Sequence, residues 1–224
     1  FDCSIYVVDC QGQLALIDAG LGRQPELIVQ NMENDGLDPE KISAVLLTHS
    51  HADHGGGAAW FKNRYGCLVY ISKEEEDIVN TGDEKKLSLD VAKKSGLYYP
   101  DYQFEPCPET RSISDGDTIE VNQVIFESII VPGHSQGSTC FKVNLEEGLA
   151  LFTGDVVFAE GIIGLLNCNG SGLGPYRENI GKLADLGIEL LFPGHRVFVV
   201  SEGQKHIDTA IEALQQLSVP KNFI

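Results

Sequence analysis

The chain has 224 residues with 33 acidic and 16 basic side chains, so its formal net charge is −17. The length favours one domain, and a composition of 42% hydrophobic and 22% charged residues excludes a disordered chain. An acidic surface repels phosphate backbones, which disfavours nucleic acid as a partner, and no apolar run reaches the roughly 18 residues of a membrane span. We therefore expect a single domain over residues 1–224 that binds neither nucleic acid nor a membrane. The chain starts at Phe1 rather than at methionine, which leaves open a leader removed from its start.

The six cysteines are irregularly spaced, and none forms a Cys-x-x-Cys pair. This pattern is typical of buried apolar residues, ahead of disulfides or redox thiols. It favours a reducing, cytoplasmic location. The cysteines are Cys3, Cys10, Cys67, Cys107, Cys140 and Cys168.

Strands and helices alternate in the first half of the predicted structure. Two apolar runs around a Gln-Gly-Gln turn predict a hairpin, and proline at the first position followed by a closing glycine predicts a helix. Ser72 is expected to cap the N-terminus of an acidic helix, and the four acidic residues at 74–77 are expected to be exposed to solvent. The predicted elements are the hairpin Ile5–Val8 and Leu14–Asp18, the helix Pro25–Asn34, the strand Ala44–Thr48, a helix through Trp60, Phe61 and Tyr65, the strand Leu68–Ile71 and the helix Glu74–Asn80.

The pattern weakens over residues 83–111, where tyrosines and a phenylalanine alternate with prolines. Long irregular stretches in compact domains are often binding loops. We expect a lid or insertion here, whose aromatic part 98–104 lines a pocket, forms a homodimer interface or is loosely packed.

The second half repeats the strand pattern and ends in an amphipathic helix, which predicts a mixed α/β protein. One face of that last helix carries apolar residues at a 3.6-residue period. The predicted strands are Thr118–Val121, Val124–Val131, Thr139–Val143, Leu149–Thr153 and Glu189–Phe192. The predicted helices are Tyr176–Leu186 and residues 202–217, with the apolar face Ile207, Ala210, Ile211, Leu214 and Leu217.

The strongest chemical signal is the spacing His-x-His-x-Asp-His, formed by His49, His51, Asp53 and His54. Imidazole nitrogens and carboxylate oxygens ligate zinc at about 2.0–2.2 Å, and four such groups within six residues surround cations only where the backbone turns. The strand before the motif and the glycines at 55–57 are expected to make that turn, because glycine permits conformations that other residues resist.

Three further ligand-type side chains, His134, Asp155 and His195, each follow an apolar run and a small turn. If these strands end at one edge, the motif and these three residues supply enough donors for two cations and a solvent ligand. Asp18 also ends a strand and is expected to orient a ligand rather than to bind metal. His206 lies off the apolar face of the last helix and is expected to be solvated.

In order and spacing, these residues resemble the metallo-β-lactamase superfamily over nearly the whole chain. The resemblance implies an αββα sandwich, with two sheets face to face and helices outside. It also implies that one metal takes His49, His51 and His134, that the other takes Asp53, His54 and His195, and that Asp155 bridges them. Asp18 matches the first motif of the family.

Departures from individual branches of the superfamily narrow the expected activity. Histidine at 51 disfavours the oxygen-reducing diiron branch, Asp155 disfavours true β-lactamases, and Phe158 replaces a tyrosine that is typical of acyl-homoserine lactonases. RNA-processing members need an inserted domain that this chain has no room for. The chain looks most like the glyoxalase II-like branch, which hydrolyses glutathione thioesters, although that branch's basic glutathione-binding residues have no counterpart after Asp155.

These features predict a metal-dependent hydrolase of a small-molecule ester, thioester or lactone. A metal-bridged hydroxide is the expected nucleophile, and Asp53 is the expected catalytic carboxylate. Zinc is the expected metal, with iron and manganese as alternatives; the substrate-binding residues stay unassigned. Two other functions remain open: a mononuclear iron enzyme similar to persulfide dioxygenases, and a binding module of the same fold without catalysis.

Overall fold

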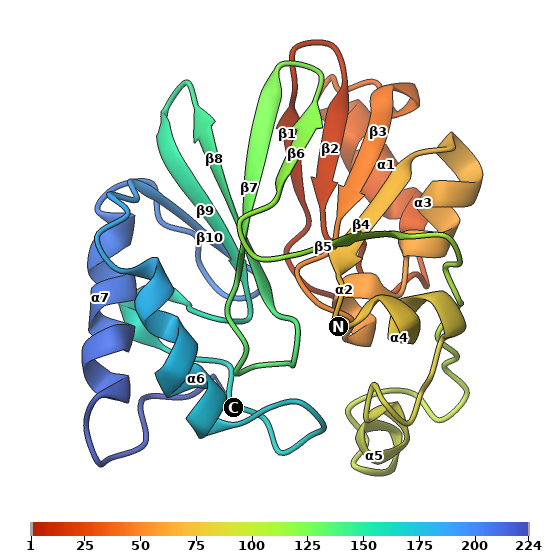
Figure 1. The fold of residues 1–224 in the computed structure, drawn as a ribbon. Helices are drawn as coiled ribbons and strands as arrows, with labels where there is room; N and C mark the ends of the chain where they lie inside the picture. The colour runs from red at the N-terminus through yellow and green to blue at the C-terminus, as the bar shows by residue number, and fades with distance from the viewer. Residues whose placement is uncertain (1, 224) are drawn as a thin grey trace. The chain divides into compact units, whose positions relative to one another are not determined.

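The computed structural model describes residues 2–223, and within them the strands form two five-stranded sheets. The chain divides into two compact units, Phe1–Ser112 with Val121–Gln123 and Ile113–Glu120 with Val124–Ile224. Each unit is built around one of the sheets and carries helices of its own, as Figure 1 shows. The predicted mixed α/β class with two sheets is confirmed.

The first sheet has the order β1-β2-β3-β4-β5, in which β1 pairs with β2 antiparallel and β2, β3 and β4 run parallel. The predicted hairpin is therefore confirmed. The strands of this sheet are β1 (Tyr6–Asp9), β2 (Leu14–Ile17), β3 (Ile42–Leu46), β4 (Leu68–Ser72) and β5 (Arg111–Ile113). The helices of this half are α1 (Pro25–Asn34), α2 (Ala52–Gly55), α3 (Ala58–Tyr65), α4 (Glu76–Thr81) and α5 (Leu89–Lys94), with a short 3₁₀ turn at Pro39–Lys41.

Helices α1 and α3 cover one face of the first sheet. Alternate residues of the strands, such as Leu14 and Leu16 of β2, pack with Met32 of α1 and Phe61 of α3 in a single buried cluster. The two-residue period of a strand places these side chains on the same face. Trp60 is half-buried and packs against this cluster.

The second sheet has the order β10-β9-β8-β7-β6, with β9 parallel to β10 and antiparallel to β8. Its strands are β6 (Thr118–Val121), β7 (Val124–Ile130), β8 (Thr139–Leu145), β9 (Gly148–Gly154) and β10 (Leu190–Pro193). The helices of this half are α6 (Leu173–Asn179) and α7 (Gly203–Leu214), with 3₁₀ turns at Ala159–Gly161 and Ile180–Leu183. All five strands lie where the sequence predicts them, to within a few residues.

Helices α6 and α7 pack on the second sheet through Tyr176, Ile207 and Leu214, in one cluster with Leu151 and Leu191 of the strands. The helix predicted at 176–186 begins three residues earlier, at Leu173, and its second half is a 3₁₀ turn. The apolar face of α7 also ends early, because the helix stops at Leu214 and leaves Leu217 fully exposed.

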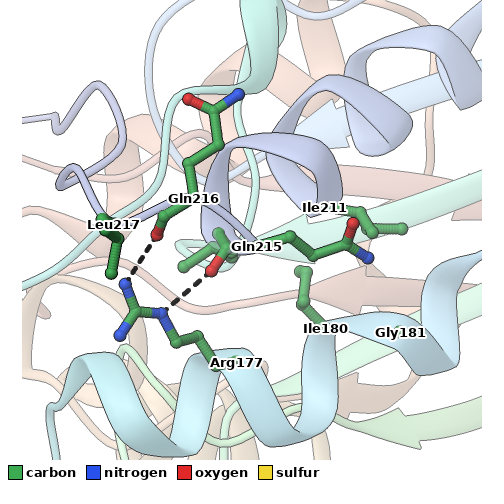
Figure 2. A pocket seen from close by; sticks show the side chains of 8 residues that line it. Arg177, Ile180, Gly181, Ile211, Gln215, Gln216 and Leu217 are labelled. Carbon is green, nitrogen blue, oxygen red and sulfur yellow. Dashed lines mark hydrogen bonds between the residues drawn. The ribbon is translucent and has the colours of Figure 1, made fainter.

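The end of α7 is held by a side chain from α6. Arg177 donates from Nε to the carbonyl of Leu214 and from Nη2 to that of Gln216, both at 2.9 Å (Figure 2). The last carbonyls of a helix lack partners within the helix, so a guanidinium that supplies two donors satisfies them. A cavity of about 360 Å³ lies beside this contact and is lined by α6, the 3₁₀ turn that follows it, α7 and the residues directly after α7.

Among residues 2–223, no helix combines the length and apolar character needed to cross a bilayer. All six cysteines in this part of the chain are free thiols, and all except Cys168 are buried. The expectation that the cysteines are buried apolar residues is thus confirmed for the other five.

Candidate metal centre

In the first unit, the predicted motif forms a tight turn at the end of β3. His51 immediately precedes α2, which carries Asp53 and His54. The turn brings the imidazole of His49 to within 4.0 Å of the His54 ring and 4.7 Å of the His51 ring, measured between centroids. His49, Asp53 and His54 are buried and His51 is half-buried. The four donors therefore form a compact group shielded from bulk water.

Asp18 fixes the orientation of His54. The Nδ1 atom of His54 lies 2.8 Å from Asp18 Oδ2, and the carboxylate also accepts bonds from the backbone N–H and the hydroxyl of Thr48. An ionised carboxylate only accepts, so His54 must carry its proton on Nδ1, which leaves the lone pair on Nε2 for a ligand. Asp18 therefore contacts His54, one of the residues that the sequence predicts as ligands.

The role of the glycines after the motif differs from the expected one. Gly56 and Gly57 have φ values of −62° and −86°, which any residue adopts. What they supply is space: a Cβ on Gly57 would lie 2.1 Å from the carbonyl oxygen of Ala19. These glycines thus allow the loop after Asp18 to pack against the motif, and Ala19 N–H donates to the His54 carbonyl at 2.8 Å.

In the second unit, Asp155 lies between two histidines. Its Oδ2 atom is 3.7 Å from His134 Nε2 and 3.6 Å from His195 Nε2. His134 follows β7, Asp155 follows β9 and His195 follows β10. All three side chains come from the same edge of the second sheet, where the sequence predicts them.

His134 repeats the arrangement seen at His54. Its Nδ1 lies 2.5 Å from the carbonyl oxygen of Gly164, which can only accept, so the lone pair again resides on Nε2. Gly164 cannot be replaced easily, because a Cβ there would lie 2.4 Å from the carbonyl oxygen of Asp155. The hydroxyl of Tyr176 donates to the carbonyl oxygen of Asp155 at 3.1 Å.

These distances and donors fit a divalent metal. Two atoms that each lie about 2.1 Å from one tetrahedral ion are roughly 3.4 Å apart. The Nε2–Oδ2 separations are 3.6 and 3.7 Å around Asp155, and His54 Nε2 lies 3.9 Å from Asp53 Oδ2. Imidazole nitrogens with carboxylate oxygens suit zinc, iron or manganese.

Cys3 lies close to the motif, although the sequence does not predict it as a ligand. Its sulfur, a carboxylate oxygen of Asp18 and a ring nitrogen of His54 lie within 4.8 Å of one another. Burial raises the pKa of the Cys3 thiol to about 12.

Two further contacts were missed from the sequence. Glu75, expected on a solvated helix start, is buried and accepts a 2.6 Å bond from the backbone N–H of Ser50, between His49 and His51. Tyr98 donates from its hydroxyl to Asp53 Oδ1 at 2.8 Å. Burial and the neighbouring Asp53 charge raise the pKa of the Tyr98 hydroxyl well above its ordinary value, so it remains a donor.

Two predictions about single side chains were wrong. Ser72 does not cap α4, because the residue before that helix is Glu75 and no side chain caps it. His206 is half-buried rather than solvated, and its Nδ1 accepts a bond from the backbone N–H of Glu160 at 2.8 Å. The cavity in Figure 2 includes none of the predicted ligand residues.

Several curated proteins are similar to this chain. An atrochrysone carboxyl ACP thioesterase of Aspergillus fumigatus is 29% identical over 89% of this chain, which spans 52% of that protein. The probable polyketide biosynthesis zinc-dependent hydrolase BaeB of Bacillus velezensis is 31% identical, over 73% of this chain and 60% of its own length. The hydroxyacylglutathione hydrolase GloC of Haemophilus influenzae is 28% identical, over 72% of this chain and 68% of its own length.

Solved structures and the family match agree with these relatives. The subclass B3 metallo-β-lactamase BJP-1 of Bradyrhizobium japonicum superposes with a TM-score of 0.75, over 94% of this chain and 84% of that one. At 19% identity, this likeness shows a shared fold. The family described as the metallo-beta-lactamase superfamily matches residues 1–195. The chain therefore belongs to the metallo-β-lactamase superfamily.

Proposed function

We propose that this protein hydrolyses a small-molecule thioester, with lactones and simple esters as further substrates, using two divalent metal ions, normally zinc. The observation that carries this proposal is the orientation of the imidazoles. His54 and His134 each bind a protein acceptor through Nδ1, so both present the Nε2 lone pair beside a carboxylate. Such an outer contact is the usual support of a metal-binding histidine.

The ligand assignment follows the family resemblance. His49, His51 and His134 would bind one ion, and Asp53, His54 and His195 the other. Asp155 would bridge the two ions, which agrees with the near-equal distances from its Oδ2 to the two histidines of its own unit. The residues 1–224 would then act as one metallo-β-lactamase-like domain.

In the reaction, the ions would supply a water of lowered pKa and an electrophile for the substrate carbonyl oxygen. The chain's own residues do the rest. Asp53 accepts a hydrogen bond from the attacking water, takes its proton as the water adds to the substrate carbonyl, and passes that proton to the leaving group. Asp18 keeps the proton of His54 on Nδ1, and buried surroundings strengthen each of these contacts.

The relatives support thioesters over other substrates. One is named as a thioesterase and another as a hydroxyacylglutathione hydrolase, while a third is named as zinc-dependent. The free thiols of the chain support a reducing, cytoplasmic location.

A hydrolysis panel on protein with counted metals tests the proposal. Thioesters, lactones, phosphoesters and β-lactams are offered to the wild type and to His51→Ala and Asp155→Ala, with His206→Ala as a histidine control. We expect about two ions and thioester turnover in wild type and control, and loss of both in the other variants. Metal content and turnover that survive His51→Ala and Asp155→Ala contradict the site, whereas a single iron with oxygen uptake supports a dioxygenase instead.

A further inference from the structure

The segment at 83–111 is anchored to the first unit by a hydrophobic cluster of its own. Tyr102 and Phe104 of this segment are buried in that cluster, and Tyr98 packs against its edge. The Tyr102 hydroxyl donates to the Leu21 carbonyl at 2.9 Å. The other buried members of the cluster are Leu21, Ala52, Ile78, Leu87 and Leu89. Of the alternatives left open for this segment, a loosely packed lid does not describe its aromatic part.

This packing holds Tyr98 in a defined place. Its ring stacks on that of Tyr102, with centroids 5.9 Å apart and an interplanar angle of 25°. From there its hydroxyl reaches Asp53 Oδ1 at 2.8 Å, a contact between residues 45 positions apart. Because the cluster and the stacking on Tyr102 hold the Tyr98 ring, the bond restrains rotation of the Asp53 carboxylate.

We propose that Tyr98 is a positioning residue for Asp53, an inference that rests on the function proposed above. The bond occupies Asp53 Oδ1 and turns Oδ2 towards His54, whose Nε2 lies 3.9 Å away. Each carboxylate oxygen has two lone pairs, so Oδ1 can accept from Tyr98 and from a water at the same time. Tyr98 thus separates the two oxygens: Oδ2 would be the atom that holds metal, and Oδ1 would accept a hydrogen bond from the attacking water.

Without the hydroxyl, Asp53 can rotate about its terminal torsion, which is broad and roughly two-fold for a carboxylate. Loss of a hydrogen bond that orients a metal ligand typically lowers metal affinity or activity about 10- to 100-fold. We expect Tyr98→Phe to weaken divalent-metal binding by this factor and to lower kcat at saturating metal, with KM changed little.

The matched control is Tyr102→Phe. It removes a hydroxyl from the stacked neighbour in the same cluster, and that hydroxyl donates to a backbone carbonyl instead of Asp53. Each variant keeps its aromatic ring and loses one hydrogen bond from a tyrosine hydroxyl. The two metal-free variants should therefore unfold at similar temperatures.

The experiment measures zinc affinity against a competing chelator, thermal unfolding without metal, and kcat and KM for a thioester, in wild type and both variants. Weaker zinc binding and lower kcat confined to Tyr98→Phe support the proposal. Equal effects in the two variants, or none in either, overturn it while leaving the hydrolase proposal intact. A wild type that binds no zinc overturns the proposed function and this inference together.

Discussion

The contact between Asp18 and His54 predicts a specific effect of Asp18→Asn. Asp18 is buried with φ of +64°, a left-handed conformation that asparagine also tolerates, so the substitution changes chemistry without changing shape. The amide oxygen can still accept from Thr48, but the amide nitrogen can only donate. His54 must then accept at Nδ1, which moves its proton to Nε2, the atom proposed to bind metal.

Asp18→Asn should lower both the stability of the metal-free protein and its zinc affinity. Asp18 accepts three bonds, at 2.7, 2.9 and 2.8 Å, from two donors of Thr48 and one of His54. Exchanging a charged acceptor for a neutral one costs about 1 kcal/mol per bond, and part of that is offset because a buried charge is removed. We expect the metal-free protein to lose about 1–2 kcal/mol of stability and zinc affinity to fall about 10- to 100-fold.

Calorimetric zinc titration against a competing chelator, with urea unfolding of the metal-free protein, measures both quantities. The control is Asp9→Asn: Asp9 is exposed, and its Oδ1 accepts a turn hydrogen bond from Gln11 N–H at 2.9 Å that an asparagine oxygen keeps. Zinc affinity in Asp18→Asn equal to that of wild type would refute the tautomer argument, whatever happens to stability.

Three further predictions concern stability. Glu75→Gln should cost about 1–3 kcal/mol in urea unfolding, because it weakens a charged bond to the motif backbone, while exposed Glu74→Gln should change little. Gly133→Ala should destabilise the fold by about 1–3 kcal/mol, because its Cβ would lie 2.3 Å from the ring of the buried Tyr176. Gly174→Ala is the control, since its Cβ would meet no atom within 4 Å, and similar melting temperatures for the two variants would contradict the prediction. Burial raises the pKa of the Cys3 thiol from 9.0 to about 12, so the thiol loses its proton at lower pH in the unfolded state than in the folded state. The free energy of unfolding should therefore fall by about 1.4 kcal/mol per pH unit between pH 9 and 12. A smaller dependence of stability on pH in Cys3→Ala checks that Cys3 is responsible.

The residues proposed as ligands could be selected from the sequence because each one stands in a recognisable local pattern. Three of them, His134, Asp155 and His195, follow strands whose apolar runs are plain in the sequence, and the spacing of the motif is specific by itself. The strands were predicted from the same apolar runs, whereas the division into two sheets was implied by the family resemblance. The assignment of ligands to individual ions stays a prediction.

The contacts that were missed depend on tertiary packing. Four acidic residues in a row look equivalent in the sequence, and only the packing of α4 beside the motif distinguishes Glu75 from its neighbours. Tyr98 lies in a stretch with little periodicity, and 45 residues separate it from Asp53. The reason for glycine at 57 was also hidden, because the Ala19 carbonyl that fills the space comes from another loop.

The hydrogen bonds that orient the imidazoles of His54 and His134 affect which cations can replace one another at the proposed site. His54 and His134 are already aimed by Asp18 and by the Gly164 carbonyl, so little ordering remains when an ion arrives. Ligands that the polypeptide orients in advance select weakly among cations of similar size, and intrinsic affinity then follows the Irving–Williams series. Under the proposed ligand assignment, the supply of metals in the cell decides which ion is bound, and preparations grown on different media should carry different ions in the same fold.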